Sequence, residues 1–219
     1  QYVEAVAAQA VASDAADMDA FLAETWNADS SKTVKDALVE KIAVIGENLN
    51  IRRFQKETQE NGCIVSYIHG GGRIGVLVKA ETAVVNDAVK EALTNVAMQV
   101  AALAPKYVSS EDVSEEYKEH EKAILLAQAK NENPDKPENI IEKMIIGRLN
   151  KELKEVCLME QAYVKAEDGK QTVAKYLQQV SKEVGADIKI TGFVRFETGE
   201  GLEKKSEDFA AEVAAQMNA

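Results

Sequence analysis

The sequence predicts an α+β fold whose core carries a protruding pair of helices. Two segments rich in β-branched residues, 63–68 and 74–78, flank the triplet Gly70 to Gly72 and are expected to pair as a hairpin. The region 111–154 consists mostly of charged helical sequence, and strand-like sequence follows it at 188–196. The chain is therefore expected to leave the sheet along one helical arm, return along the other and complete the same sheet.

The first third of the chain predicts helices followed by an extended segment. Apolar residues recur at helical spacing from Val3 to Val11, and a short segment carrying Phe21, Leu22 and Trp26 follows. Thr33 with Asp36 has the pattern of a helix start, and the apolar stripe behind it ends near Gly46. From Leu49 the helical period is lost, so residues 49–54 are interpreted as extended.

The middle of the chain predicts one long helix and a helical hairpin. Apolar residues from Val85 to Val100 form a broad face, and Pro105 marks the end of that helix. Two charged segments are then separated by residues 131–137, which contain two prolines. Thin apolar seams on both arms suit an antiparallel pair in solvent; their members are Tyr117, Ile124, Leu125, Ile141, Met144, Ile145 and Leu149.

The last part of the chain predicts an extended segment at 156–164, a helix at 173–184 that Gly185 caps, and the strand at 188–196. Phe209, Val213 and Met217 follow at four-residue steps, which indicates a short terminal helix.

Composition limits the classes of function. The 219 residues hold 26 Lys and Arg against 37 Asp and Glu, which gives a formal charge of −11, so an extended nucleic-acid-binding surface is not expected. The two cysteines and two histidines lack zinc-ligand spacing. No apolar run approaches the roughly 20 residues that span a bilayer. We therefore expect no nucleic acid, no metal and no membrane as partners, and an aqueous, reducing compartment.

The motifs that usually carry chemistry lack their structural context. Residues Gly70 to Gly75 satisfy G-x-G-x-x-G, but strand sequence follows where a dinucleotide loop would open a helix. His69 with the glycine triplet imitates an esterase oxyanion loop, yet no Gly-x-Ser-x-Gly nucleophile exists in the sequence. Pairs of Asp and Glu side chains at helical spacing are most simply interpreted as solvent-exposed residues on helix faces. We expect no catalytic residue and no cofactor. His69 either serves only as a turn residue or has a functional role. The helical hairpin is either a structural spur or an arm that contacts a partner.

Four segments then carry a resemblance to a known family. They are Ile-Gly-Glu-Asn-Leu-Asn at 45–50, Ser-Tyr-Ile-His-Gly-Gly-Gly-Arg-Ile-Gly at 66–75, Thr-Gly-Phe-Val-Arg-Phe-Glu at 191–197 and Asp-Phe-Ala-Ala-Glu-Val-Ala-Ala at 208–215. In this order they resemble the elongation factor Ts family, the nucleotide-exchange factors for elongation factor Tu. The resemblance spans nearly the whole chain.

The resemblance implies a domain organisation. Two small antiparallel sheet-and-helix subdomains are expected, with an inserted antiparallel coiled-coil hairpin and a C-terminal helix. Residues 1–61 would form an incomplete N-terminal core subdomain, 62–108 with 155–197 the C-terminal core subdomain, 109–154 the hairpin, and 198–219 the C-terminal module. The family's N-terminal helical domain and its Thr-Asp-Phe-Val stretch have no counterpart here, so the chain is expected to be a truncated core.

The resemblance also implies a mechanism by contact. The family binds elongation factor Tu, both GDP-bound and nucleotide-free, and speeds GDP release by disturbing the GTPase's magnesium and phosphate site, in the cytoplasm of a bacterium or in an organelle. Matching partner-binding positions are Ile45, Gly46, His69, Val164, Lys165, Phe209 and Val213. Lys165 departs from the more apolar residue expected there. The alternative is a non-catalytic scaffold that uses the charged hairpin to form a homodimer or to dock another protein.

Overall fold

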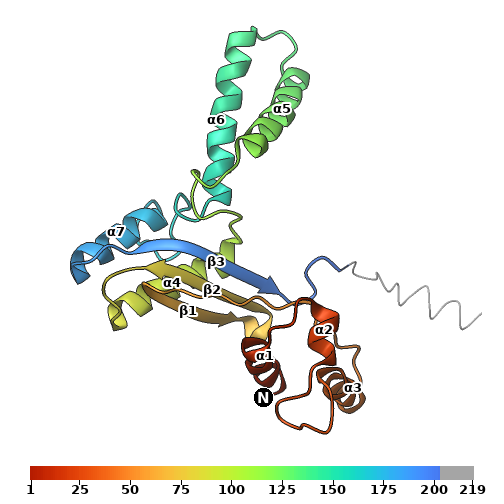
Figure 1. Ribbon diagram of the computed structural model, residues 1–219. Helices are drawn as coiled ribbons and strands as arrows, with labels where there is room; N and C mark the ends of the chain where they lie inside the picture. The colour runs from red at the N-terminus through yellow and green to blue at the C-terminus, as the bar shows by residue number, and fades with distance from the viewer. Residues whose placement is uncertain (203–219) are drawn as a thin grey trace, which may run out of the picture. The chain divides into compact units, whose positions relative to one another are not determined.

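The computed structural model describes residues 1–202 and divides the chain into two compact units, Gln1–Thr58 and a second unit from Gln59 onward. Helices occur in both units and a three-stranded sheet in the second, which confirms the α+β class (Figure 1). The predicted terminal helix, with Phe209 and Val213, lies outside the described residues.

The first unit contains the helices α1 (Tyr2–Ala12), α2 (Met18–Ala23) and α3 (Val34–Ile45). The predicted start of α3 is confirmed as a capping box: the Thr33 hydroxyl accepts from the Asp36 N–H at 3.1 Å, and the Asp36 carboxylate accepts from the Thr33 N–H at 2.9 Å. The core of the unit is small and consists of Ala10, Phe21, Trp26, Val34 and Ala37.

Residues 49–54 of the first unit form no strand ladder within the described residues. Ile51 and Phe54 instead pack against the helical core, and the rings of Phe54 and Phe21 are 4.8 Å apart between centroids. Backbone pairing in this unit is an isolated bridge between Thr25 and Thr33. Helix packing, rather than sheet formation, therefore orders the described part of this unit.

The sheet of the second unit consists of β1 (Gly62–His69), β2 (Ile74–Glu81) and β3 (Lys189–Glu197) in the order β1-β2-β3, with both pairs antiparallel. The predicted hairpin is therefore confirmed, and β3 joins the free side of β2 after the helical excursion. Along β2 the side chains of Val76, Val78 and Ala80 are buried while their neighbours are more exposed, as expected for a sheet covered on one face.

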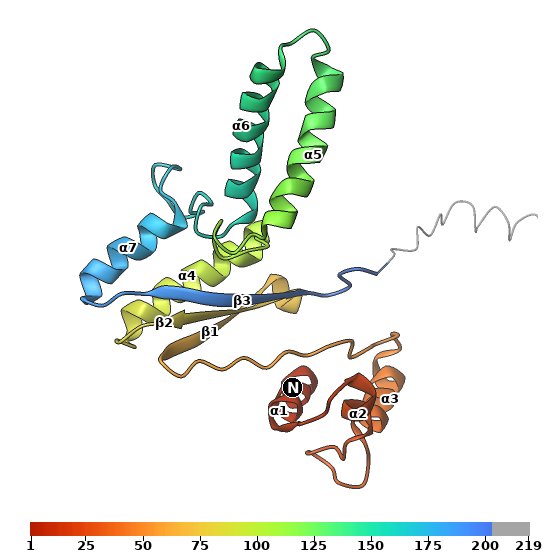
Figure 2. The ribbon, with the colours of Figure 1, turned by 45° about the horizontal axis from the view of Figure 1, so that its top comes forward.

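Helices α4 (Asp87–Leu103) and α7 (Val173–Val184), shown in Figure 2, supply most of the rest of this core, which also includes Leu158, Tyr163 and Ile188. Asn86 caps α4 through its side-chain oxygen, which accepts from the Val89 N–H at 2.9 Å. The helix ends at the left-handed Ala104, just before Pro105, as predicted. Gly185 likewise ends α7 at a φ of 72°. Eight residues of α4 are buried, at about 1.5–3 kcal/mol for each large apolar side chain.

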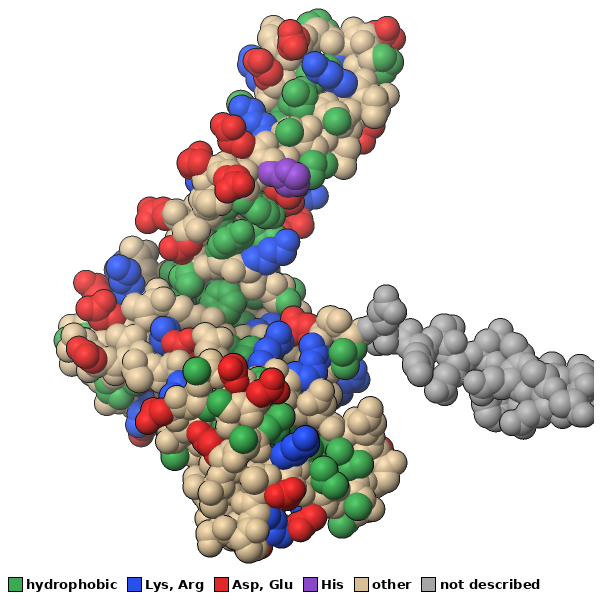
Figure 3. Space-filling model, turned by 45° about the vertical axis from the view of Figure 1, so that its right-hand side comes forward, with side chains coloured by type: hydrophobic (Ala, Val, Ile, Leu, Met, Phe, Trp, Pro, Cys, Tyr) green, Lys and Arg blue, Asp and Glu red, His purple; other side chains and the backbone are tan. Residues whose placement is uncertain are grey.

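The predicted helical hairpin is formed by α5 (Glu115–Glu132) and α6 (Glu138–Val156), which run side by side. Ala129, Ile141 and Ile145 are buried between them. The Arg148 guanidinium meets the Glu132 carboxylate at 2.7 Å across the pair. On the face shown in Figure 3, acidic and basic side chains alternate along this hairpin. Exposed ion pairs contribute little, so the apolar seam holds the arms together.

The prediction of an extended segment at 156–164 is wrong. Helix α6 continues to Val156, and residues 158–160 form turns. Backbone bonds to the chain before the hairpin replace a strand: the Lys106 N–H donates to the Val156 carbonyl at 2.8 Å, and the Leu158 N–H donates to the Tyr107 carbonyl at 2.9 Å. Within this segment Leu158 and Tyr163 pack into the core of the second unit, whereas Val164 remains 47% exposed.

A pair of carboxyl groups near the base of the hairpin gives a testable prediction. Burial and then the Glu121 carboxylate raise the pKa of Glu152 above its ordinary value of 4.5, with Lys106 opposing. The folded chain thus holds this proton more tightly than the unfolded chain, so the contribution to stability falls as the pH rises from 4.5 through the raised pKa. Glu152→Gln should therefore raise the free energy of unfolding near pH 7 and give no gain near pH 4.

Urea denaturation at the two pH values measures this difference. Glu142→Gln, which neutralises an exposed carboxylate on the same helix, is the matched control. The same gain for both variants would assign the effect to net charge rather than to the Glu121–Glu152 pair.

Candidate functional site

Ile45 and Gly46 lie at the C-terminal end of α3 in the first unit. Gly46 has a φ of 77°, and its N–H donates to the Ile42 carbonyl at 2.8 Å, so it ends the helix in the left-handed conformation. A Cβ at Gly46 would meet nothing within 4 Å. The adjacent Val44 and Ile45 are 79% and 52% exposed. This helix end therefore presents apolar side chains and open backbone, which suits contact with a protein surface.

His69 is the last residue of β1, at the tip of the β1–β2 hairpin. The glycines that follow form a short 3-10 turn, η1 (Gly70–Gly72), in which Gly71 has a φ of 66°. The Tyr67 hydroxyl lies 2.9 Å from Nδ1 of His69, and Ile68 between them is 65% exposed. Tyr67 itself packs partly against the core. The exposed imidazole is thus oriented by a side chain anchored in the sheet.

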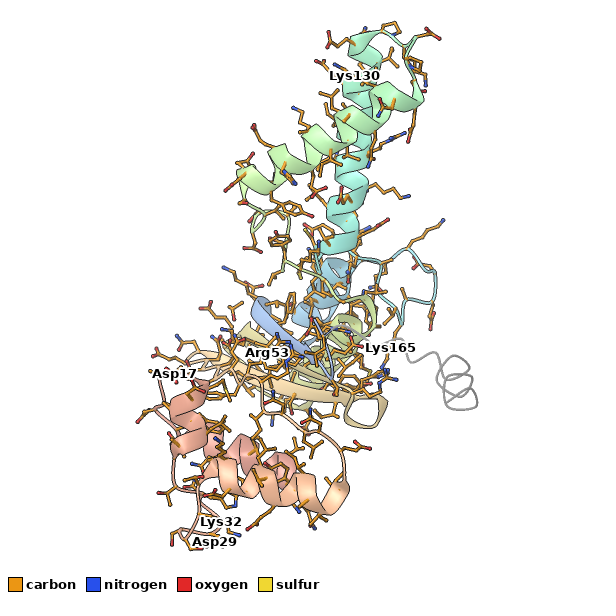
Figure 4. The ribbon with its side chains drawn as sticks, turned by 90° about the vertical axis from the view of Figure 1, so that its right-hand side faces the viewer. Asp17, Asp29, Lys32, Arg53, Lys130 and Lys165 are labelled. Carbon is orange, nitrogen blue, oxygen red and sulfur yellow. The ribbon has the colours of Figure 1, made fainter. Side chains whose placement is uncertain are left out.

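Val164 and Lys165 lie together in the loop that precedes α7. The Val164 side chain is 47% exposed, while its N–H donates to Oε1 of Gln99 at 2.8 Å. Nζ of Lys165, labelled in Figure 4, donates to Oδ1 of Asn95 at 2.7 Å. Asn95 in turn donates to the Tyr176 hydroxyl at 2.9 Å. Helix α4 therefore holds this loop by two polar side chains.

Stacked tyrosine rings support the same loop. The rings of Tyr163 and Tyr176 are 4.2 Å apart between centroids with an interplanar angle of 15°. Burial and the hydrogen bond with Tyr176 raise the pKa of the Tyr163 hydroxyl well above its usual value, so it stays protonated. These side chains, with Lys165, line a concavity of 910 Å³. The arrangement is a concave surface whose side chains are held by stacking and hydrogen bonds.

The structure brings together only part of the set predicted from the sequence. Val164 and Lys165 share one loop, Ile45 and Gly46 share one helix end, and His69 lies on a separate element. Gln99 and Asn95 were missed by the sequence reasoning. Gln99 lies among apolar residues on the buried face of α4, and this polar interruption of an apolar stripe was the available signal.

The buried cysteine of the second unit, Cys157, has an environment that keeps its thiol protonated. Cys157 is fully buried, and burial, followed by repulsion from Glu160 and Asp112, raises its pKa to about 11. Its thiol is therefore protonated at neutral pH. Within residues 1–202 there is no group of three or more His, Cys, Asp and Glu side chains that could hold a metal ion. None of the helices described is long and apolar enough to cross a membrane.

The fold defines a class: an α+β protein with a helical hairpin, whose candidate residues lie on exposed helix ends, turns and loops. Comparison with known proteins then gives the family. The family model described as Elongation factor TS matches residues 1–200. The chain belongs to the elongation factor Ts family.

Three relatives named Elongation factor Ts illustrate the match. One from Clostridium botulinum (Type A) is 50% identical over 210 residues, which is 96% of this chain and 67% of that protein. One from Clostridium novyi is 49% identical over 218 residues, 100% of this chain and 70% of that protein. One from Clostridium perfringens is 52% identical over 186 residues, 85% of this chain and 60% of that protein. The chain spans about two thirds of the length of these relatives.

Proposed function

We propose that this chain binds elongation factor Tu, in its GDP-bound and nucleotide-free forms, and promotes GDP release by disturbing the magnesium and phosphate site of the GTPase. The family match over residues 1–200 carries this proposal, because it includes Ile45, Gly46, His69, Val164 and Lys165. All five positions lie on exposed or loop-borne surfaces. The compartment that follows from this role is the bacterial cytoplasm or an organelle.

The physical basis of exchange is linkage. A factor that binds the nucleotide-free GTPase more tightly than the GDP-bound form must weaken GDP binding by the same coupling free energy. Such a factor needs shaped contact surfaces and no acid, base, metal or cofactor of its own. A protonated Cys157 thiol is consistent with that role, and so is a described candidate set made of two aliphatic side chains, a glycine, an imidazole and a lysine.

Release of fluorescent GDP from elongation factor Tu tests the proposal. Adding the chain should raise the release rate in proportion to its concentration until the GTPase is saturated. The longer Clostridium botulinum relative serves as the reference, and we expect it to act faster, because by resemblance a stretch outside this chain intrudes near the magnesium site. An unchanged release rate together with no binding in a direct titration would refute the proposal.

His69→Ala should reduce the acceleration of GDP release by roughly tenfold, about the loss of one good interface contact. The side chain is exposed, so the unfolding midpoint should hardly change. His120→Ala is the matched control, since it removes the other histidine from an exposed position on α5. Equal losses for both variants would remove His69 from the contact set.

A homodimer formed through the helical hairpin is the alternative assembly. The observation that favours it is the exposure of Ile124, Ile140 and Ile146 at 38%, 41% and 54% on α5 and α6. Light scattering of the chain alone distinguishes the two assemblies, because an exchange factor that works as a monomer gives the monomer mass at every concentration used in the release assay.

A further inference from the structure

We propose that Gln99 is a positioning residue, which holds the loop of Val164 and Lys165 in the conformation that contacts the partner. This inference rests on the proposed function, because it assigns a role to a residue behind one of its contact surfaces. Gln99 itself is fully buried.

The side-chain amide of Gln99 binds three groups of the loop. Its Nε2 donates to the Ala162 carbonyl at 3.0 Å and to Oε1 of Gln161 at 3.1 Å. Its Oε1 accepts from the Val164 N–H at 2.8 Å. Both amide hydrogens and the amide oxygen are therefore engaged, and together they span residues 161–164.

The chemistry of this position is unusual for its surroundings. Val96 and Val100, on the same helix, are fully buried and apolar. An unbonded carboxamide among them would be costly, and an apolar side chain of similar size would fill the space equally well. The amide at position 99 is therefore needed for its hydrogen bonds to the loop and not for the packing of α4.

The rest of the loop is fixed around that amide. Nε2 of Gln161 donates to the Glu155 carbonyl at 2.7 Å, which joins the loop to the end of α6. The Tyr163 N–H donates to the Gln171 carbonyl at 2.8 Å. One turn before Gln99, Asn95 holds Nζ of Lys165. With its backbone held in this way, the loop directs the Val164 side chain outward without reorganising on contact, which lowers the entropy lost on binding.

The test compares Gln99→Met with Val96→Ala. Methionine retains the length of the side chain and loses all three hydrogen bonds, whereas Val96→Ala destabilises the same helix and removes no hydrogen bond to the loop. Gln99→Met should raise the half-saturating concentration in the GDP-release assay by roughly tenfold and leave the maximal rate nearly unchanged. Hydrogen exchange at the Val164 amide should also accelerate. Val96→Ala should change neither the half-saturating concentration nor hydrogen exchange at the Val164 amide, although it lowers the unfolding midpoint.

A double variant tests whether Gln99 acts through the loop. If it does, Gln99→Met combined with Val164→Ala should weaken the assay response by less than the product of the two single effects. Should Gln99→Met not fold, Gln99→Asn, which withdraws the amide by one carbon, gives the same comparison. If the unaltered chain neither accelerates GDP release nor binds elongation factor Tu, the proposed function fails. If it accelerates release and Gln99→Met behaves like Val96→Ala, the positioning role alone is overturned.

Discussion

Phe21→Ala should unfold the first unit, residues 1–58, while the sheet of the second unit stays folded. Phe21 is fully buried and is one of the five buried apolar residues that form the core of this unit. Truncating a buried phenylalanine costs about 3–5 kcal/mol. A unit of this size has a net stability of only a few kcal/mol, so the expected loss is as large as the entire free energy of unfolding of the unit.

Tryptophan fluorescence measures this outcome directly. Trp26 is the single tryptophan of the chain and is 7% exposed in the core of the first unit. Unfolding of that unit should shift its emission to longer wavelength, while amide protection in α4 persists. Val11→Ala, at a side chain 75% exposed on α1, should leave the emission unchanged. A native emission spectrum for Phe21→Ala would show that the unit tolerates the cavity.

The elements that could be predicted from the sequence are those with local causes. Thr33 and Asp36 cap α3 through bonds three residues apart, and Gly185 ends α7 through its own φ. The strands around Gly70 to Gly72 were predictable for the same reason, since β-branched alternation and a flexible turn act within a few residues. The two arms of the hairpin were indicated by charge and a thin apolar seam.

The features that were missed depend on contacts between distant residues. The path of residues 156–164 is set by bonds to residues 106–108, about fifty positions away in the chain. The loop of Val164 is held by Gln99, whose partners cannot be read from helical periodicity. In the first unit, Ile51 and Phe54 carry an apolar pattern that fits either a strand or a packed loop, and the helical core decides between them.

Gly62→Ala should cause the largest loss of stability in the second unit. Gly62 begins β1 with a φ of 137°, a conformation that side-chain-bearing residues rarely adopt. A Cβ there would overlap the Ala80 carbonyl oxygen. Ala80 cannot withdraw, because it is fully buried in the central strand and pairs with both Cys63 and Ile190. The clash must therefore displace the start of β1, at a cost above about 3 kcal/mol.

Gly71→Ala is the matched control, since Gly71 also has a positive φ, 66°, but a Cβ there would meet nothing within 4 Å. The left-handed conformation alone should cost about 1–2 kcal/mol. Urea denaturation should thus separate the variants clearly, with Gly62→Ala having the lower midpoint. Equal midpoints would mean that backbone conformation, and not the contact with Ala80, requires glycine at position 62.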